Sequence, residues 1–213
     1  MSSKTNVNLK TFIYIDILQP QVASFLATIS QGYLPVEGQA SLYIEITPGI
    51  AINSLTDIAL KKTKVQPGMQ VVERESGVLE LHSYDQGLLR AAGDSILEET
   101  GLKETDRIKP RIESHQIING IHEYHAMMIN RMRHGNMIVK MDTMLVLETS
   151  PAGYALFAAN EAEKAANINI LEVRAMGAFG RLHIGGSEEE VNQASEAILK
   201  ALASIEGREA VKK

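Results

Sequence analysis

Hydrophobic and polar positions follow the same succession of patterns in both halves of the chain. Each half reads as a strand, a helix with apolar residues at every third or fourth position, a second strand, an aliphatic helix, two further strands and a last helix. In the first half these segments are 12–18, 20–31, 41–47, 49–64, 69–74, 78–83 and 85–101. In the second half they are 116–121, 123–134, 143–149, 152–167, 170–176, 180–184 and 187–207. The pattern predicts an α/β (α+β) fold in which helices cover one side of a mixed sheet.

An internal duplication explains this repetition. The chain matches itself without a gap at an offset of 103 residues, and the shared hydrophobic rhythm extends over about 100 residues. Identical pairs at this offset are Leu42 and Leu145, Glu45 and Glu148, Pro48 and Pro151, Ala59 and Ala162, and Gly77 and Gly180. We therefore expect two copies of one domain, at residues 1–103 and 104–213, joined by the polar segment 103–115.

Composition narrows the class of protein. The 213 residues are 45% hydrophobic and 22% charged, which is typical of a soluble globular chain. Cysteine is absent, which excludes disulfides and thiolate chemistry and fits a reducing cytosol. The net charge of −5 is shared by both halves and argues against a nucleic-acid partner. Apolar runs of about seven residues are too short to span a membrane, and the first residues do not resemble a secretory signal. We expect the tails, 1–8 and 208–213, to be disordered.

No motif in the sequence predicts catalysis. His122 and His125 lie three residues apart beside Glu123, but no third ligand is nearby, so surface histidines are favoured over a metal site. The segment GAFGRLHIGG at 177–186 lacks the Lys-Ser/Thr of a phosphate loop and lies between two strands, which favours tight turns. The carboxylates do not sit in a setting that suggests acid–base work. We expect no enzyme activity, no catalytic residue, no metal and no cofactor.

Two groups of side chains leave an interpretation open. Six methionines gather in one region, where they favour a hydrophobic core over an adaptable interface: Met127, Met128, Met132, Met137, Met141 and Met144. Lys61 and Lys164 end the second helix of each copy. They read either as solvated residues that suit the helix dipole or as lateral contacts that recur around a ring.

The loop between the paired strands differs in charge between the copies. In the first copy it is Glu73-Arg74-Glu75-Ser76-Gly77, whereas the second has Gly177-Ala178-Phe179-Gly180 without a charge. On the pattern alone, an exposed charged hairpin with no special role is favoured.

The segment LVLETSPAGYALFAANEAEKAANINILEVRAMGAFGRLHIGGSEEEVNQASEAI resembles the bacterial microcompartment shell domain. The resemblance rests on an Ala-rich helix that ends in a Lys-Ala pair and on a Gly-flanked loop between strands. Elements that normally end that domain precede it in both copies, as FIYIDILQPQVASFLATISQGY and QIINGIHEYHAMMINRMRHGN. Over almost its whole length the chain is therefore similar to the circularly permuted tandem-domain shell proteins of carboxysomes.

This resemblance implies an assembly and a pore. Three chains would form a pseudohexagonal homotrimer, possibly stacked in pairs, within the carboxysome shell in the cytoplasm. Glu73 and Arg74 would gate a central pore together with Glu75, Ser76 and Gly77. The loop Gly177-Ala178-Phe179-Gly180 would form a fixed collar or a support for the gate. Lys61 and Lys164 would contact other shell proteins, and ribulose bisphosphate and phosphoglycerate would pass through.

Two alternatives stay open at the level of sequence. One is a shell protein of another microcompartment, with the same assembly and a different cargo. The other is a duplicated α/β sensor that binds a phosphorylated small molecule between its domains.

Overall fold

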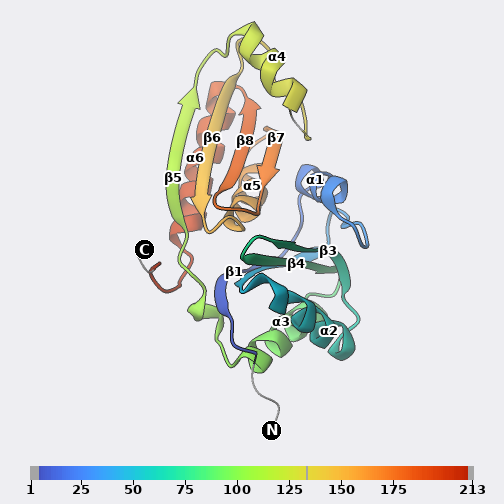
Figure 1. The fold of residues 1–213 in the computed structure, drawn as a ribbon. Coiled ribbons are helices and arrows are strands. Elements are labelled where there is room, and N and C mark those ends of the chain that lie inside the picture. The colour runs from blue at the N-terminus through green and yellow to red at the C-terminus, as the bar shows by residue number, and fades with distance from the viewer. Residues whose placement is uncertain (1–4, 133, 211–213) are drawn as a thin grey trace. The chain divides into compact units, whose positions relative to one another are not determined.

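A computed structural model describes residues 5–132 and 134–210, which form two compact units (Figure 1). Unit 1 contains the chain up to Leu18, Ile29–Lys109 and the residues from Glu206 onward. Unit 2 contains Gln19–Thr28 and Pro110–Ile205. The predicted disorder of the tails falls in part on 1–4 and 211–213, outside the described residues. Where the tails are described, Asn8 begins a strand and Arg208 pairs with Ile108, so these parts are ordered.

Unit 1 is a four-stranded sheet with helices on one face. Its strands are β1 (Asn8–Ile15), β2 (Ala40–Thr47), β3 (Gln66–Glu73) and β4 (Ser76–Ser83), in the order β1-β2-β4-β3. A short turn, η1 (Gly49–Ala51), leads into α2 (Ile52–Lys62), and α3 (Gln86–Thr100) and η2 (Glu104–Asp106) follow β4. Alternate strand residues such as Leu42, Ile44 and Leu81 pack with Leu55 and Ala92 in one buried cluster, which fixes α2 and α3 on that face.

Unit 2 repeats this arrangement. Its strands are β5 (Arg111–Ile118), β6 (Thr143–Ser150), β7 (Asn169–Arg174) and β8 (Gly180–Gly186), in the order β5-β6-β8-β7. The helices α5 (Tyr154–Ala165) and α6 (Glu188–Ala203) lie along one side of the sheet, and α4 (Glu123–Met132) follows the end of β5 (Figure 1). The unit also includes most of α1 (Pro20–Ile29), which comes from the first half of the sequence.

The duplication is confirmed at the level of atoms. A Cβ added at Gly77 would lie 2.3 Å from the Gly49 carbonyl oxygen, and one added at Gly180 would lie 2.2 Å from that of Ala152. Both pairs are related by the offset of 103. The same offset relates the irregularity between Leu9 and Thr11 in β1 to that between Ile112 and Ser114 in β5. The boundaries 1–103 and 104–213 stay a prediction, because the compact units group residues by packing rather than by repeat.

The α/β fold class is confirmed, but the sheets are not mixed. Every pairing between the described strands is antiparallel. The helical crossover from β2 to β3 does join parallel strands, but β4 lies between them, so the two never pair. The sequence pattern predicts the order of the elements along the chain, but it does not predict that β4 lies between β2 and β3 in the sheet.

Two element boundaries also differ from the prediction. β5 begins at Arg111, inside the segment expected to be a linker. It is an edge strand with most side chains exposed, so it lacks the apolar alternation that reveals a strand. α6 ends at Ala203, before Gly207. The other predicted helix limits, at Asp85, Gly101 and Ser187, are helix caps in the structure: Asp85 and Ser187 accept hydrogen bonds from first-turn N–H groups, and Gly101 is left-handed with φ 71°.

The methionine cluster is not a core. Met144 is buried, but the other five side chains are 47–77% exposed: Met127, Met128, Met132, Met137 and Met141. The apolar stripe of α4 has the period of a core helix, yet only Ala126 of that helix is buried. The expectation of a core was therefore wrong. In the part of the chain that the structure describes, no helix is long and apolar enough to cross a membrane.

Candidate functional site

The charged loop of the first copy is the tip of the β3–β4 hairpin. Glu73 pairs with Ser76 across the ladder, and Arg74 and Glu75 form the turn between them. Arg74 has φ 54°, a left-handed conformation that few non-glycine residues adopt. Glu73, Arg74 and Glu75 are exposed, and none of their side chains has an ion-pair or hydrogen-bond partner among the described residues. Three charges thus lie at the tip without an ion-pair partner among the described residues.

The base of this hairpin is held firmly. The Gly49 N–H donates to the Glu75 carbonyl at 2.7 Å, next to the close approach of Gly49 to Gly77. The Ser76 hydroxyl donates to Glu45 at 3.2 Å, and Lys10 donates to Ser76 at 2.9 Å and pairs with Glu45 at 2.6 Å. Ser76 and Gly77 are buried. Of the five predicted gate residues, two therefore belong to the framework and three form an exposed tip.

The loop of the second copy has the same base and a different tip. Gly180 is buried against Ala152, as Gly77 is against Gly49. Gly177 has φ 103°, which only glycine adopts easily, whereas Ala178 and Phe179 are exposed. This tip presents one aromatic ring and no charge.

Beneath the first hairpin, the sheet face opposite the helices carries a buried polar network. Glu80 accepts from Ser41 at 2.6 Å and contacts His82 Nδ1 at 3.1 Å, and all three are fully buried. His82 Nε2 is buried and has no hydrogen-bond partner in the described part of the chain. Burial and then the charges of Glu45 and Glu80 raise the pKa of Tyr43 on the same face. These polar groups tie β2 to β4.

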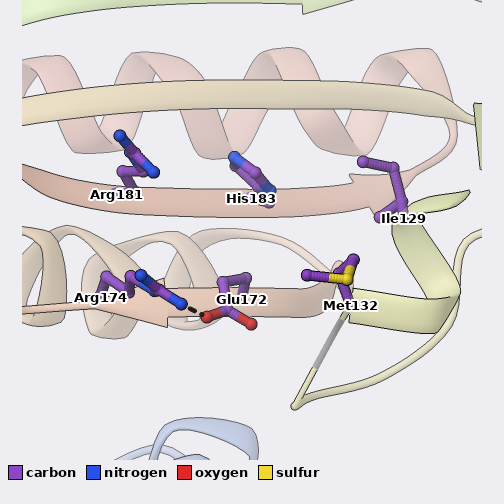
Figure 2. A pocket seen from close by; sticks show the side chains of 6 residues that line it. All are labelled: Ile129, Met132, Glu172, Arg174, Arg181 and His183. Atoms are coloured by element: carbon purple, nitrogen blue, oxygen red, sulfur yellow. Dashed lines mark ion pairs between the residues drawn. The ribbon is translucent and has the colours of Figure 1, made fainter.

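On the equivalent face of unit 2 lies a cavity of about 190 Å³ that the sequence did not reveal (Figure 2). Glu172 and Arg174 from β7 and Arg181 and His183 from β8 line it, with Ile129 and Met132 of α4. Arg174 pairs with Glu172 at 3.5 Å, and Arg181 pairs with Glu148 of β6 at 2.8 Å. The only sequence signal was charge at every second position of two neighbouring strands.

The surroundings of His183 in this cavity change the pKa of its imidazole. Burial lowers its pKa from the ordinary value of 6.5, and the Arg181 charge lowers it further, whereas Glu172 and Glu148 act in the opposite direction. The imidazole is therefore held in its neutral form more strongly than in water.

The two lysines proposed for lateral contacts each bind a carboxylate of their own helix. Lys61 pairs with Asp57 at 2.5 Å, and Lys164 pairs with Glu161 at 2.7 Å. The Lys61 pair is exposed and the Lys164 pair is partly exposed. Ion pairs at such positions contribute about 0–1 kcal/mol, so either lysine can exchange its partner at little cost.

His122 precedes α4 and hydrogen-bonds to the first turn of that helix. Its Nδ1 accepts from the Tyr124 N–H at 3.2 Å, at the start of α4. Within residues 5–132 and 134–210, no group of three or more His, Asp or Glu side chains is arranged to hold a metal ion.

Comparison with known proteins relates the whole chain to shell proteins. The model of the CsoS1D N-terminal domain family matches residues 9–106. The carboxysome shell protein CcmP of Synechococcus elongatus is 50% identical over 203 residues, which are 95% of each chain. The carboxysome shell protein CsoS1D of Prochlorococcus marinus is 43% identical over 96% of this chain and 80% of the relative.

Solved structures agree over the full length. The double ringed trimeric shell protein MSM0271 from the RMM microcompartment superposes with a TM-score of 0.93 and 41% identity, over 96% of this chain and 100% of that one. The fused permuted hexameric shell protein MSM0275 from the same microcompartment superposes with a TM-score of 0.92 and 42% identity, over 95% of this chain and 100% of that one.

Proposed function

Because the chain belongs to the family of permuted tandem-domain carboxysome shell proteins that includes CcmP and CsoS1D, we propose that it forms a trimeric ring with a gated central pore for phosphorylated metabolites. The protein is a structural component of the carboxysome shell, in the cytoplasm, and not an enzyme. The pore, its gate and its cargo are the proposal.

The unpaired charges at the tip of the first hairpin carry this proposal. In a ring of three chains, threefold symmetry repeats Glu73 and Arg74 around one axis. Like charges that meet at a constriction repel one another unless they pair with opposite charges. Pairing of Glu73 with Arg74 of the same or of a neighbouring hairpin defines two arrangements of the tip, one across the axis and one withdrawn from it. If the two arrangements differ in free energy by about a few kcal/mol, a bound ligand can select one of them.

The two loops would then have different tasks. The buried base at Ser76 and Gly77 keeps the first hairpin in place while its tip changes state. The second tip, Ala178 and Phe179, has no charge to pair and serves as a collar. Three Arg74 guanidinium groups around an open pore favour anions, because guanidinium matches phosphate in charge and geometry. Ribulose bisphosphate and phosphoglycerate are the proposed cargo.

Contacts beyond one ring complete the proposal. Similarity to a double ringed trimeric protein favours stacking of two trimers. Lys61 and Lys164 lie at equivalent helix ends of the two copies and would contact neighbouring shell proteins in the plane of the ring.

The gate is tested with Arg74→Ala in reconstituted shells. Loss of the guanidinium should slow the passage of phosphoglycerate several-fold and leave a small neutral solute unaffected, because only the anion is attracted by charge. Lys200→Ala, which removes one exposed positive charge from α6, is the matched control and should pass both solutes normally. Phosphoglycerate flux equal to that of the unchanged protein would refute the role of Arg74.

A further inference from the structure

The cavity of unit 2 contains two arginines that face each other across neighbouring strands. Arg174 of β7 and Arg181 of β8 are directly paired in the antiparallel ladder, and both line the cavity. Like charges at directly opposite positions of a ladder destabilise a sheet. The two arginines therefore do not serve the pairing of β7 with β8, and their presence needs another explanation.

The first copy shows how the same fold fills this position without charge. At the offset of 103, Arg174 corresponds to Val71 and Arg181 to Val78. The two valines are also directly paired, between β3 and β4, and Val78 is buried while Val71 is partly buried. Pairs of β-branched side chains stabilise a ladder. The second copy thus has a like-charge pair where the first copy has an apolar pair.

Each guanidinium group is only partly engaged by a carboxylate. Arg181 donates to Glu148 through its Nε at 2.8 Å, and the Nε of Arg174 lies 3.5 Å from Glu172. Within the described part of the chain, the terminal amino groups of both arginines have no hydrogen-bond acceptor. Each arginine therefore retains the N–H donors of both amino groups for a ligand.

The carboxylates around the cavity already have cationic or hydrogen-bonding neighbours. One oxygen of Glu172 lies beside Arg174, and the other is 3.1 Å from His134 Nδ1. Glu148 accepts from Arg181. The two glutamates balance the charge of the two arginines, and they repel a multiply charged anion more strongly than a singly charged one. Free donors at a site without net charge therefore favour a monovalent anion over a phosphorylated metabolite.

The cavity is small, with a charged end and an apolar end. Its volume is about 190 Å³, below the roughly 300–1,000 Å³ of sites for drug-sized ligands. In Figure 2 the two arginines lie at one end and Ile129 and Met132 of α4 at the other, with Glu172 and His183 between them. A ligand that fits this arrangement is short and carries its charge at one end.

From these observations we infer that the cavity binds a small monocarboxylate, with its carboxylate between Arg174 and Arg181 and its short hydrocarbon chain toward Ile129 and Met132. Guanidinium matches a carboxylate in charge and in planar geometry, and the bound anion lies between two like charges that otherwise repel. The site is formed by unit 2 alone and is separate from the charged hairpin tip. It therefore stands independently of the proposed pore and its cargo.

The affinity follows from the exposure of the two arginines. Their side chains are 61% and 50% exposed, so water and salt screen their charges. We expect binding in the millimolar range that weakens as the salt concentration rises.

Methyl NMR tests this site, because both residues at its apolar end carry methyl groups. The full chain, labelled at Met and Ile methyl groups, is titrated with propionate at constant ionic strength. The Met132 and Ile129 signals should shift and saturate, whereas the signal of Met141, which is exposed and does not line the cavity, should not move. Hydrogencarbonate, which lacks the hydrocarbon chain, and inorganic phosphate should both bind more weakly. Tighter binding of either than of propionate would overturn the assignment to a monocarboxylate.

The first copy supplies the design of the decisive variant. Arg174→Val with Arg181→Val installs the apolar pair found at Val71 and Val78, so the sheet should stay folded while the shifts caused by propionate disappear. Arg174→Gln alone should weaken propionate binding about tenfold, as expected for the loss of a hydrogen bond to a charged group.

Arg131→Gln is the matched control. Arg131 is an exposed residue of α4 that does not line this cavity, so the variant removes one positive charge from the same unit. It should bind propionate as the unchanged protein does. Equal weakening by Arg131→Gln and Arg174→Gln would indicate general attraction by charge and refute the site. Shifts that persist in the variant with Arg174→Val and Arg181→Val would refute it as well.

Discussion

At the scale of single residues, the same position of the fold carries very different chemistry in the two copies. Glu80 of β4 is fully buried and bonded to Ser41 and His82, whereas its equivalent His183 lines the cavity of unit 2. The shared backbone places both side chains on the same face of the sheet, whereas the residue type and its neighbours differ between the copies.

His183 gives a prediction of pH dependence. Its pKa is lowered in the folded chain, so below about pH 6.5 the unfolded chain binds a proton more readily than the folded one. The stabilising contribution of neutral His183 is present above that pH and is lost as the pH falls toward the folded pKa. The free energy of unfolding, measured with urea, should therefore fall less between about pH 7 and about pH 5 in His183→Gln than in the unchanged protein. An imidazole that titrates at or above its ordinary pKa by NMR would contradict this.

Whether the role of a residue can be predicted from the sequence also depends on the residues around it in the fold. Gly77 and Gly180 were identified from the repeat, because a glycine kept in both copies at one offset indicates a steric need. The cavity around Arg174 and Arg181 was missed, since charges at alternate strand positions usually mark a solvated face. Only the fold brings these residues next to α4.

At the scale of elements, most helices and strands follow from periodicity, and the exceptions share one cause. β5 begins earlier than predicted because an exposed edge strand shows no alternation. The apolar positions around Met127 and Met128 predicted a helix correctly. An apolar stripe that faces a core and one that lies at the surface have the same period, so the pattern does not distinguish them. Sequence reveals an apolar side of an element, and not what covers it.

The contact of α1 with α5 in unit 2 predicts a specific loss of stability. Glu163→Ala removes the acceptor of two helix N–H groups and should destabilise unit 2 by about 0.5–2 kcal/mol, the usual range for a lost helix cap. Hydrogen exchange at the amides of Gln21 and Val22 should accelerate most. Glu161→Ala on the same helix, which removes a partly exposed pair with Lys164 and a long hydrogen bond from Asn160, should cost about 0–1 kcal/mol. Equal effects of the two substitutions would argue against capping by Glu163.

At the scale of the whole molecule, the proposed lateral contacts predict a change in assembly without a change in folding. Replacing both lysines, by Lys61→Ala and Lys164→Ala, should abolish flat sheets of rings seen by electron microscopy at high protein concentration. Unfolding stability should change by no more than about 1 kcal/mol per pair, since the Lys61 pair is exposed and the Lys164 pair is partly exposed. Lys200→Ala should form sheets normally. Sheets of unchanged order in the double variant would exclude these lysines as lateral contacts.

The place of α1 has a consequence for how such an assembly behaves on dilution. α1 packs in unit 2, while the chain before and after it belongs to unit 1, so the contact of α1 with α5 forms as a single chain folds. In a ring of three chains, three contacts of α1 with α5 are therefore intramolecular and form at any concentration. The ring would dissociate as a third-order equilibrium into intact chains, never into single domains. Charged and uncharged loops would consequently alternate around the axis in strictly equal number, a stoichiometry that gene fusion guarantees and that two separate proteins would have to balance by their levels of synthesis.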